Sequence, residues 1–124
     1  MVINVPNQGL FRVVTKDAEV QGVSIPKGSR IWVMFGAANR DESTFGDSEA
    51  FDPTRDNLKE HIAFGKGHHF CIGAPLSRLE GKVAFEELVR RLKLPTFAEG
   101  NTFEYQSSYV LRGLAGLEID IEKK

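Results

Sequence analysis

The sequence is organised around Phe64-Gly65-Lys66-Gly67-His68-His69-Phe70-Cys71-Ile72-Gly73, a segment that holds the single cysteine and two of the three histidines. Glycines at positions 65, 67 and 73 permit backbone conformations that a β-carbon would penalise. We therefore expect a tight loop at this point, with its backbone passing close to another group.

A long helical pattern begins directly after this loop. Pro75 stands where the first residue of a helix is favoured, so Cys71 is expected just before the helix N-terminus. Free backbone amides and the positive end of the helix dipole favour the thiolate form of a cysteine placed there. A thiolate on a glycine-rich loop can act as a metal ligand or as a nucleophile, whereas a lone cysteine in an ordinary loop is usually buried and inert.

The pattern from Phe64 to Glu80 resembles the heme-binding signature of the cytochrome P450 superfamily in its bacterial form. The matching residues are Phe64, Gly65, Gly67, His69, Cys71, Gly73, Leu76, Arg78 and Glu80. In that family the cysteine is the proximal ligand of heme iron, and electron donation from its sulfur favours O–O cleavage. The resemblance implies that Cys71 binds the iron of heme b. The other residues that it assigns to the cofactor site are Arg12, Phe64, Gly65, His69 and Gly73.

Length and composition are those of one soluble domain spanning residues 1–124. The chain is 41% hydrophobic and 27% charged, with a formal net charge of −1, so nothing favours binding to nucleic acid or to an anionic membrane. A single cysteine rules out an internal disulfide and fits a reducing cytoplasm. No apolar run approaches the roughly 20 residues of a membrane span, and the N-terminus lacks a signal-peptide pattern. We expect a cytoplasmic protein.

The first third of the chain is rich in branched and aromatic residues and predicts short strands. The expected strands are Leu10–Thr15, Ala18–Gln21, Val23–Ile25 and Ser29–Phe35, the middle two forming a hairpin about Gly22. These runs resemble the hairpin segment that precedes the heme loop in the family. An arginine facing inward needs an anionic partner. The resemblance places Arg12 against a heme propionate, and the alternative is that it faces solvent.

The segment that follows resembles the meander of the family. Residues 37–41 (Ala-Ala-Asn-Arg-Asp) predict a helical turn, and residues 42–57 predict irregular structure. In the family the arginine of the meander joins an upstream Glu-x-x-Arg motif, and the residues before Arg12 contain neither Glu nor Arg. Arg55 is therefore expected either to face solvent or to pair with another group.

A single long helix is predicted from Pro75 to about Lys93. Its apolar positions are Leu76, Leu79, Val83, Phe85, Leu88, Val89 and Leu92. A face this broad should be covered on more than one side. The loop and the helix are also locally basic, through Lys66, Arg78, Lys82, Arg90 and Arg91. The resemblance implies that an acidic electron-transfer protein docks there, although a charged helix face is more often simply solvated.

Beyond Pro95 the sequence predicts further strands at Thr102–Tyr105, Tyr109–Leu111 and Leu117–Ile121. The run Leu111-Arg112-Gly113-Leu114 resembles the C-terminal strand pair of the family. The expected fold class is therefore α+β, with small hairpins and one long helix after the ligand loop. It corresponds to the C-terminal third of the cytochrome P450 fold.

The first functional hypothesis is a truncated heme-thiolate protein of monooxygenase lineage. His69 and Arg12 would neutralise the two propionates, and Phe64 and Phe70 would shield the thiolate from water. His68 is expected to face solvent. Monooxygenation also needs a distal wall, a proton-delivery group and a substrate cavity, for which the chain has no pattern. We therefore expect no catalysis by this chain alone; a separate complementing chain could supply those parts.

The alternative hypotheses do not involve heme. One is a heme-free, non-catalytic remnant that buries its apolar faces as a homodimer, since such patches usually mark an interface. A zinc site is disfavoured, because Cys71 and the three histidines (His61, His68 and His69) lack the spacing of structural zinc ligands. A Cys–His nucleophile needs a base and an oxyanion site, and the sequence offers no pattern for either.

Overall fold

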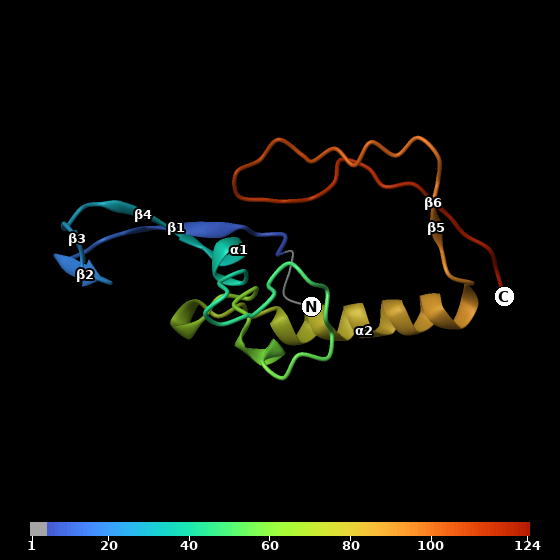
Figure 1. Ribbon diagram of the computed structural model, residues 1–124, viewed down its shortest axis with the longest axis horizontal. Helices are drawn as coiled ribbons and strands as arrows, with labels where there is room; N and C mark the ends of the chain where they lie inside the picture. Colours follow the sequence, from blue (N-terminus) through green and yellow to red (C-terminus); the bar gives the residue numbers. More distant parts are fainter. Residues whose placement is uncertain (1–4) are drawn as a thin grey trace. The chain divides into compact units, whose positions relative to one another are not determined.

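The computed structural model describes residues 5–124, with the elements in the order β1 to β4, α1, α2, β5 and β6 (Figure 1). Its internal contacts divide the chain into two units. The first unit holds the chain up to Ala63 together with Ser108–Arg112. The second unit holds Phe64–Ser107 and Gly113–Lys124.

The first unit contains two antiparallel strand pairs, of which the inner one is a hairpin. Strand β1 (Gly9–Val13) pairs with β4 (Arg30–Met34), and β2 (Ala18–Val20) pairs with β3 (Val23–Ile25). The positive φ angles of Gln21 (50°) and Gly22 (79°) give the tight β2–β3 connection the twist that suits a two-residue hairpin. The four predicted strands of this region are confirmed, with their ends shifted by a residue or two.

Close packing fixes the start of β1. Gly9 is buried, and a β-carbon there would lie 2.4 Å from both the indole Nε1 of Trp32 and the carbonyl oxygen of Val33. Phe11 is paired with Trp32 across the two strands, and their rings stack with centroids 5.5 Å apart. Only glycine fits position 9 without moving strand β4.

A short helix, α1 (Phe35–Ala38), follows β4 and begins earlier than the predicted helical turn at 37–41. Phe35, expected at the end of a strand, is instead the first helical residue. Its carbonyl oxygen accepts a hydrogen bond from the Asn39 amide at 3.0 Å, and its side chain is buried. Residues 36–38 are small and allow the chain to turn there. Burial of the Phe35 ring then favours a helix that begins at position 35 over a longer strand.

Two polar side chains hold the irregular segment that follows α1. Asn39 is buried, and its Oδ1 accepts a hydrogen bond from the Ile62 amide at 2.8 Å. The Arg55 guanidinium donates to the carbonyl oxygens of Gly46 and Asp47, and to that of Ala50 at 3.3 Å. Arg55 thus pairs with backbone carbonyls of the loop. The sequence left two alternatives for Arg55, exposure to solvent or pairing with another group, and pairing is correct.

The second unit contains the long helix α2 (Ala74–Arg91), which confirms the predicted helix with slightly different ends. Gly73 is its N-cap, and Pro75 is the second helical residue. At the C-terminal end, Leu92 takes an extended conformation and leads to β5 (Thr96–Phe97). Strand β5 pairs antiparallel with β6 (Ile119–Asp120), so the end of the chain returns beside the segment that follows α2 (Figure 1).

Three of the C-terminal predictions need correction. The expected strands at 102–105 and 109–111 are reduced to isolated bridges, and 117–121 is a strand only at Ile119–Asp120. Phe103 has a positive φ of 54°, which interrupts an extended run. The Asn101 side chain bonds both the amide and the carbonyl of Glu118, at 3.0 and 2.9 Å, in place of a strand neighbour. Strand β5 was not predicted.

Within residues 5–124, no helix combines the length and the apolar character needed to cross a membrane. The same residues include two short 3-10 helices, at Leu58–Glu60 and Gly67–His69. The second of these lies inside the cysteine loop.

Candidate functional site

The cysteine loop is shaped by its backbone. Gly65 and Gly67 have φ angles of 72° and 70°, in the left-handed region that favours glycine. Between them and the cysteine, the Phe70 amide donates to the Gly67 carbonyl oxygen at 3.0 Å. The Cys71 amide donates to the Phe64 carbonyl oxygen at 2.8 Å and closes the loop. The prediction of a tight loop with special glycine conformations is confirmed at positions 65 and 67.

Gly73 differs from this expectation. Its φ is −81°, which any residue can adopt, so the backbone does not require glycine there. A β-carbon at position 73 would instead lie 3.8 Å from the Cys71 sulfur. The absence of a side chain at Gly73 therefore keeps the space beside the sulfur open.

Cys71 is an exposed free thiol, and only Ile72 and the N-cap Gly73 separate it from α2. Its carbonyl oxygen accepts a hydrogen bond from the amide of Ala74, the first residue of the helix, at 3.1 Å. The predicted position of the cysteine just before the helix N-terminus is confirmed. Within residues 5–124, no cluster of three or more His, Cys, Asp or Glu side chains could hold a metal ion. The sulfur donor that this loop presents is the single cysteine thiol.

Aromatic rings flank the loop. The centroids of Phe64 and Phe70 are 6.5 Å apart with their planes tilted by 58°, and the guanidinium carbon of Arg78 lies 4.7 Å from the Phe64 centroid. Phe64 is half-buried, whereas Phe70 is half-exposed and Ile72 fully exposed. The apolar surface beside the thiol is therefore accessible to a ligand.

His69 and Arg12, which the resemblance assigns to the site, belong to different units of the structure. His68 and His69 are both exposed in the 3-10 helix before the cysteine. In the other unit, Arg12 is half-buried on β1, and its Nη1 donates to the Phe11 carbonyl oxygen at 2.8 Å. Arg12 and Arg30 also line a hollow beside this strand, so two guanidinium groups border it.

Helix α2 leaves a broad apolar face uncovered. The exposed fractions of Leu76, Leu79 and Val83 are 59%, 57% and 50%. The apolar helix face predicted from the sequence is therefore present, and no other part of the second unit buries it.

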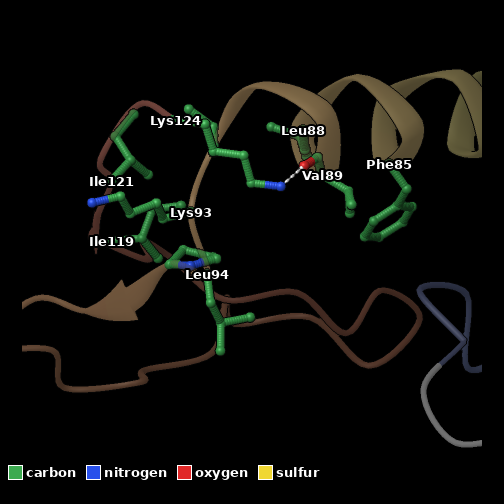
Figure 2. Close-up of a pocket in the computed structure, with 10 residues that line it drawn as sticks. Phe85, Leu88, Val89, Lys93, Leu94, Ile119, Ile121 and Lys124 are labelled. Carbon is green, nitrogen blue, oxygen red and sulfur yellow. Dashed lines mark hydrogen bonds between the residues drawn. The ribbon is translucent and has the colours of Figure 1, made fainter.

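A second apolar feature, the α2–β6 groove, was not predicted as such. It is lined by Phe85, Leu88, Val89, Leu92, Leu94, Pro95, Ile119 and Ile121, with Lys93 and Lys124 at its rim. Its volume is about 480 Å³. Figure 2 shows side chains from α2 on one side, residues 119 and 121 on the other, and the Lys124 ammonium bonded to the Val89 carbonyl oxygen. The alternation of apolar and polar residues at 117–121 was the sequence signal for the wall of the groove that Ile119 and Ile121 form.

The basic side chains of α2 and of the cysteine loop differ in whether an acidic side chain pairs with them. Near its C-terminus, Arg90 and Arg91 both bond the Glu87 carboxylate, at 2.6 and 2.7 Å, and these bonds, that of Arg90 foremost, lower the pKa of Glu87. In the middle of the helix, Lys82 is paired with Glu86 at 3.8 Å, whereas Arg78 near its start and Lys66 in the cysteine loop are exposed. Glu87 therefore offsets one of the two positive charges at the far end of the helix, while Lys66 and Arg78 keep the surface basic beside the cysteine loop.

The comparisons with known proteins agree on one family. The family model described as Cytochrome P450 matches residues 3–112. The biotin biosynthesis cytochrome P450 of Bacillus subtilis is 36% identical over 117 residues, which are 94% of this chain and 29% of that protein. The 6-deoxyerythronolide B hydroxylase of Saccharopolyspora erythraea is 38% identical over 118 residues, with the same two shares.

Solved structures agree. The substrate-free cytochrome P450 CYP150A6 of Mycobacterium marinum matches with a TM-score of 0.93 at 34% identity, over 98% of this chain and 32% of that one. P450BioI, solved in complex with an acyl carrier protein ligated to hexadec-9Z-enoic acid, matches with a TM-score of 0.89 at 34% identity, over 98% of this chain and 31% of that one. The chain thus spans about 30% of the length of these relatives.

Proposed function

This chain belongs to the cytochrome P450 family, and from that membership we propose that it is the heme-thiolate segment of such a protein, with Cys71 binding the iron of heme b. The observation that carries the proposal is the loop itself. Two left-handed glycines and the Phe64–Cys71 hydrogen bond present one exposed thiol at the start of a helix. A single thiolate donor would suit an iron that takes most of its other ligands from a porphyrin.

The surroundings of the thiol fit a large flat apolar group. Gly73 leaves the space beside the sulfur open, and Phe70 and Ile72 offer exposed apolar surface next to it. Phe64 and Gly65 would complete this wall from the other end of the loop. Residues of this kind around a metal-bound sulfur control its access to water and its basicity.

Two cationic or hydrogen-bonding side chains are proposed for the propionates. His69 is exposed within the loop, and Arg12 is half-buried on β1 with a backbone carbonyl as its partner. Pairing with a propionate would satisfy the guanidinium better than this single neutral acceptor does. When bound, heme supplies the one-electron and oxygen chemistry typical of the family.

An absorption spectrum tests the proposal. The purified chain is mixed with ferric heme, reduced and exposed to carbon monoxide, and the thiolate-type difference spectrum is expected. Cys71→Ala should abolish this signature, whereas His69→Ala should retain it with weaker heme binding. A thiolate signature that persists in Cys71→Ala, or equal heme binding through a histidine, would overturn the assignment.

We further propose that these 124 residues do not catalyse monooxygenation alone. The chain spans about 30% of its relatives, and α2 leaves Leu76, Leu79 and Val83 uncovered. Activity would require the rest of the P450 fold, and an acidic electron-transfer protein would then dock on the basic surface at Lys66, Arg78 and Lys82. Product formation coupled to reductant consumption by this chain alone would contradict the proposal.

A second candidate function is a heme-free module that self-associates through its apolar surfaces. The exposed face of α2 and the α2–β6 groove favour it, because apolar patches of this kind usually mark an interface. A homodimer or a complementing chain would provide the cover. Sedimentation equilibrium tests the homodimer, and a single species of 13.8 kDa that persists on concentration would rule it out.

A further inference from the structure

Arg78 makes a contact that none of the roles proposed above uses. It lies in the second turn of α2, and its guanidinium carbon is 4.7 Å from the ring centroid of Phe64. The same ring has Phe70 as a neighbour at 6.5 Å. A cation at this distance from an aromatic ring is attracted by the negative face of the ring.

Phe64 connects this contact to the cysteine. While its ring meets Arg78, its carbonyl oxygen accepts the hydrogen bond from the Cys71 amide at 2.8 Å. The residue that opens the loop is therefore tied to the helix after the loop through its side chain, and to the cysteine through its backbone. All three residues belong to the second unit.

We propose that Arg78 is a positioning residue for Cys71, because it holds Phe64 in the place from which the Phe64 carbonyl fixes the cysteine. The proposal rests on the proposed function only in taking Cys71 as the iron ligand. A ligand must be held close to its productive geometry by neighbours whose own conformations are locked. Arg78 provides such a lock from the rigid helix.

Other arginines of α2 show that this contact is specific. Arg90 and Arg91 bond the Glu87 carboxylate three and four residues away, as exposed helical arginines commonly do. Arg78 instead meets a ring that precedes the helix by ten residues. Methionine at position 78 would keep much of the side-chain length and remove the charge, whereas lysine would keep the charge.

Hydrogen exchange of the Cys71 amide, followed by NMR on the heme-free 124-residue chain, tests the proposal directly. A cation–π contact at an exposed site corresponds to a factor of about two to five in an equilibrium constant. Arg78→Met should speed exchange of this amide by about that factor, and Arg78→Lys should restore most of the protection. Arg90→Met is the matched control, and it should leave the Cys71 amide unchanged.

The Leu92 amide, which bonds Leu88 at the far end of α2, reports on the part of the helix remote from the loop. Its exchange should stay constant in Arg78→Met. Unchanged exchange of Cys71, an equal change at Leu92, or an equal effect of Arg90→Met would each overturn the role of Arg78. If exchange responds as expected but no thiolate spectrum forms with heme, the positioning role stands and the proposed heme function fails.

Discussion

The backbone amide of Cys71 donates a hydrogen bond to the carbonyl oxygen of Phe64 at 2.8 Å, and this bond closes the loop that presents the only cysteine. Inside the closed loop, Gly65 and Gly67 take left-handed conformations. The position of the thiol is thus a property of the backbone. Substitutions that strain this backbone should act on the cysteine without touching it.

The first prediction concerns Gly67, whose φ is +70° with open space around the place of a β-carbon. Gly67→Ala should lower the free energy of unfolding by about 1–2 kcal/mol, because an alanine in the left-handed region is strained. Gly81 lies inside α2, also with open space, so Gly81→Ala should raise the free energy of unfolding by about 0.5–1 kcal/mol. Urea titrations of the two variants check the opposite signs. Equal effects would contradict the role of backbone strain in the loop.

Local patterns predicted the loop, the four N-terminal strands, the hairpin about Gly22 and α2, because each depends on residues close in sequence. The family resemblance added the correct context, an α+β part of the cytochrome P450 fold. Sequence reasoning placed the helical turn after β4 two residues too late, because burial of Phe35 at the start of α1 outweighs its strand propensity. It also missed the side-chain bonds of Asn39 to Ile62 and of Asn101 to Glu118, which join residues far apart in sequence.

The second prediction concerns Arg55, whose guanidinium bonds three backbone carbonyls of residues 46–50. Arg55→Lys should lower the free energy of unfolding by about 1–3 kcal/mol, because one ammonium group cannot span acceptors that a planar fork reaches together. Urea unfolding measured at low and high salt checks this. The effect should persist in high salt, since the acceptors carry no net charge.

Arg40 provides the control for this salt dependence. Its Nε pairs with the largely exposed carboxylate of Glu49 at 3.2 Å. Arg40→Lys should cost less than about 1 kcal/mol, and salt should reduce that cost further. If the two variants responded alike to salt, the assignment of Arg55 to the loop carbonyls would be wrong.

The third prediction concerns the Asp41 carboxylate. The Ser43 hydroxyl bonds Asp41 Oδ1 at 2.6 Å and the Ser43 amide bonds it at 2.9 Å, and both lower the pKa of Asp41 below its ordinary value of 3.8. Because the folded pKa is lowered, the stabilisation is present above pH 3.8 and is lost as the pH falls through the folded value. Ser43→Ala should raise the pKa of Asp41 toward 3.8, as measured by NMR titration of the carboxyl carbon. Ser108→Ala, which removes a hydroxyl elsewhere, should leave it unchanged. An Asp41 pKa that does not move in Ser43→Ala would show that the Ser43 hydroxyl is not what lowers it.

The last prediction concerns self-association through α2. Leu79 and Val83 lie four residues apart on one helix face, with exposed fractions of 57% and 50%. Burying an aliphatic side chain fully is worth roughly 1.5–3 kcal/mol, so covering these two half-exposed residues should contribute about that much on each protomer, and about 3–6 kcal/mol to a symmetric dimer. The double variant Leu79→Ser with Val83→Ser should therefore weaken association about a hundred- to ten-thousandfold in sedimentation equilibrium, because both protomers carry it. The effect on the fold should be smaller, since about half of each side chain is already exposed. Glu80→Ser, on the same helix, is the matched control and should associate as the unaltered chain does. Association that is equally tight in the double variant would move the interface away from this face of α2.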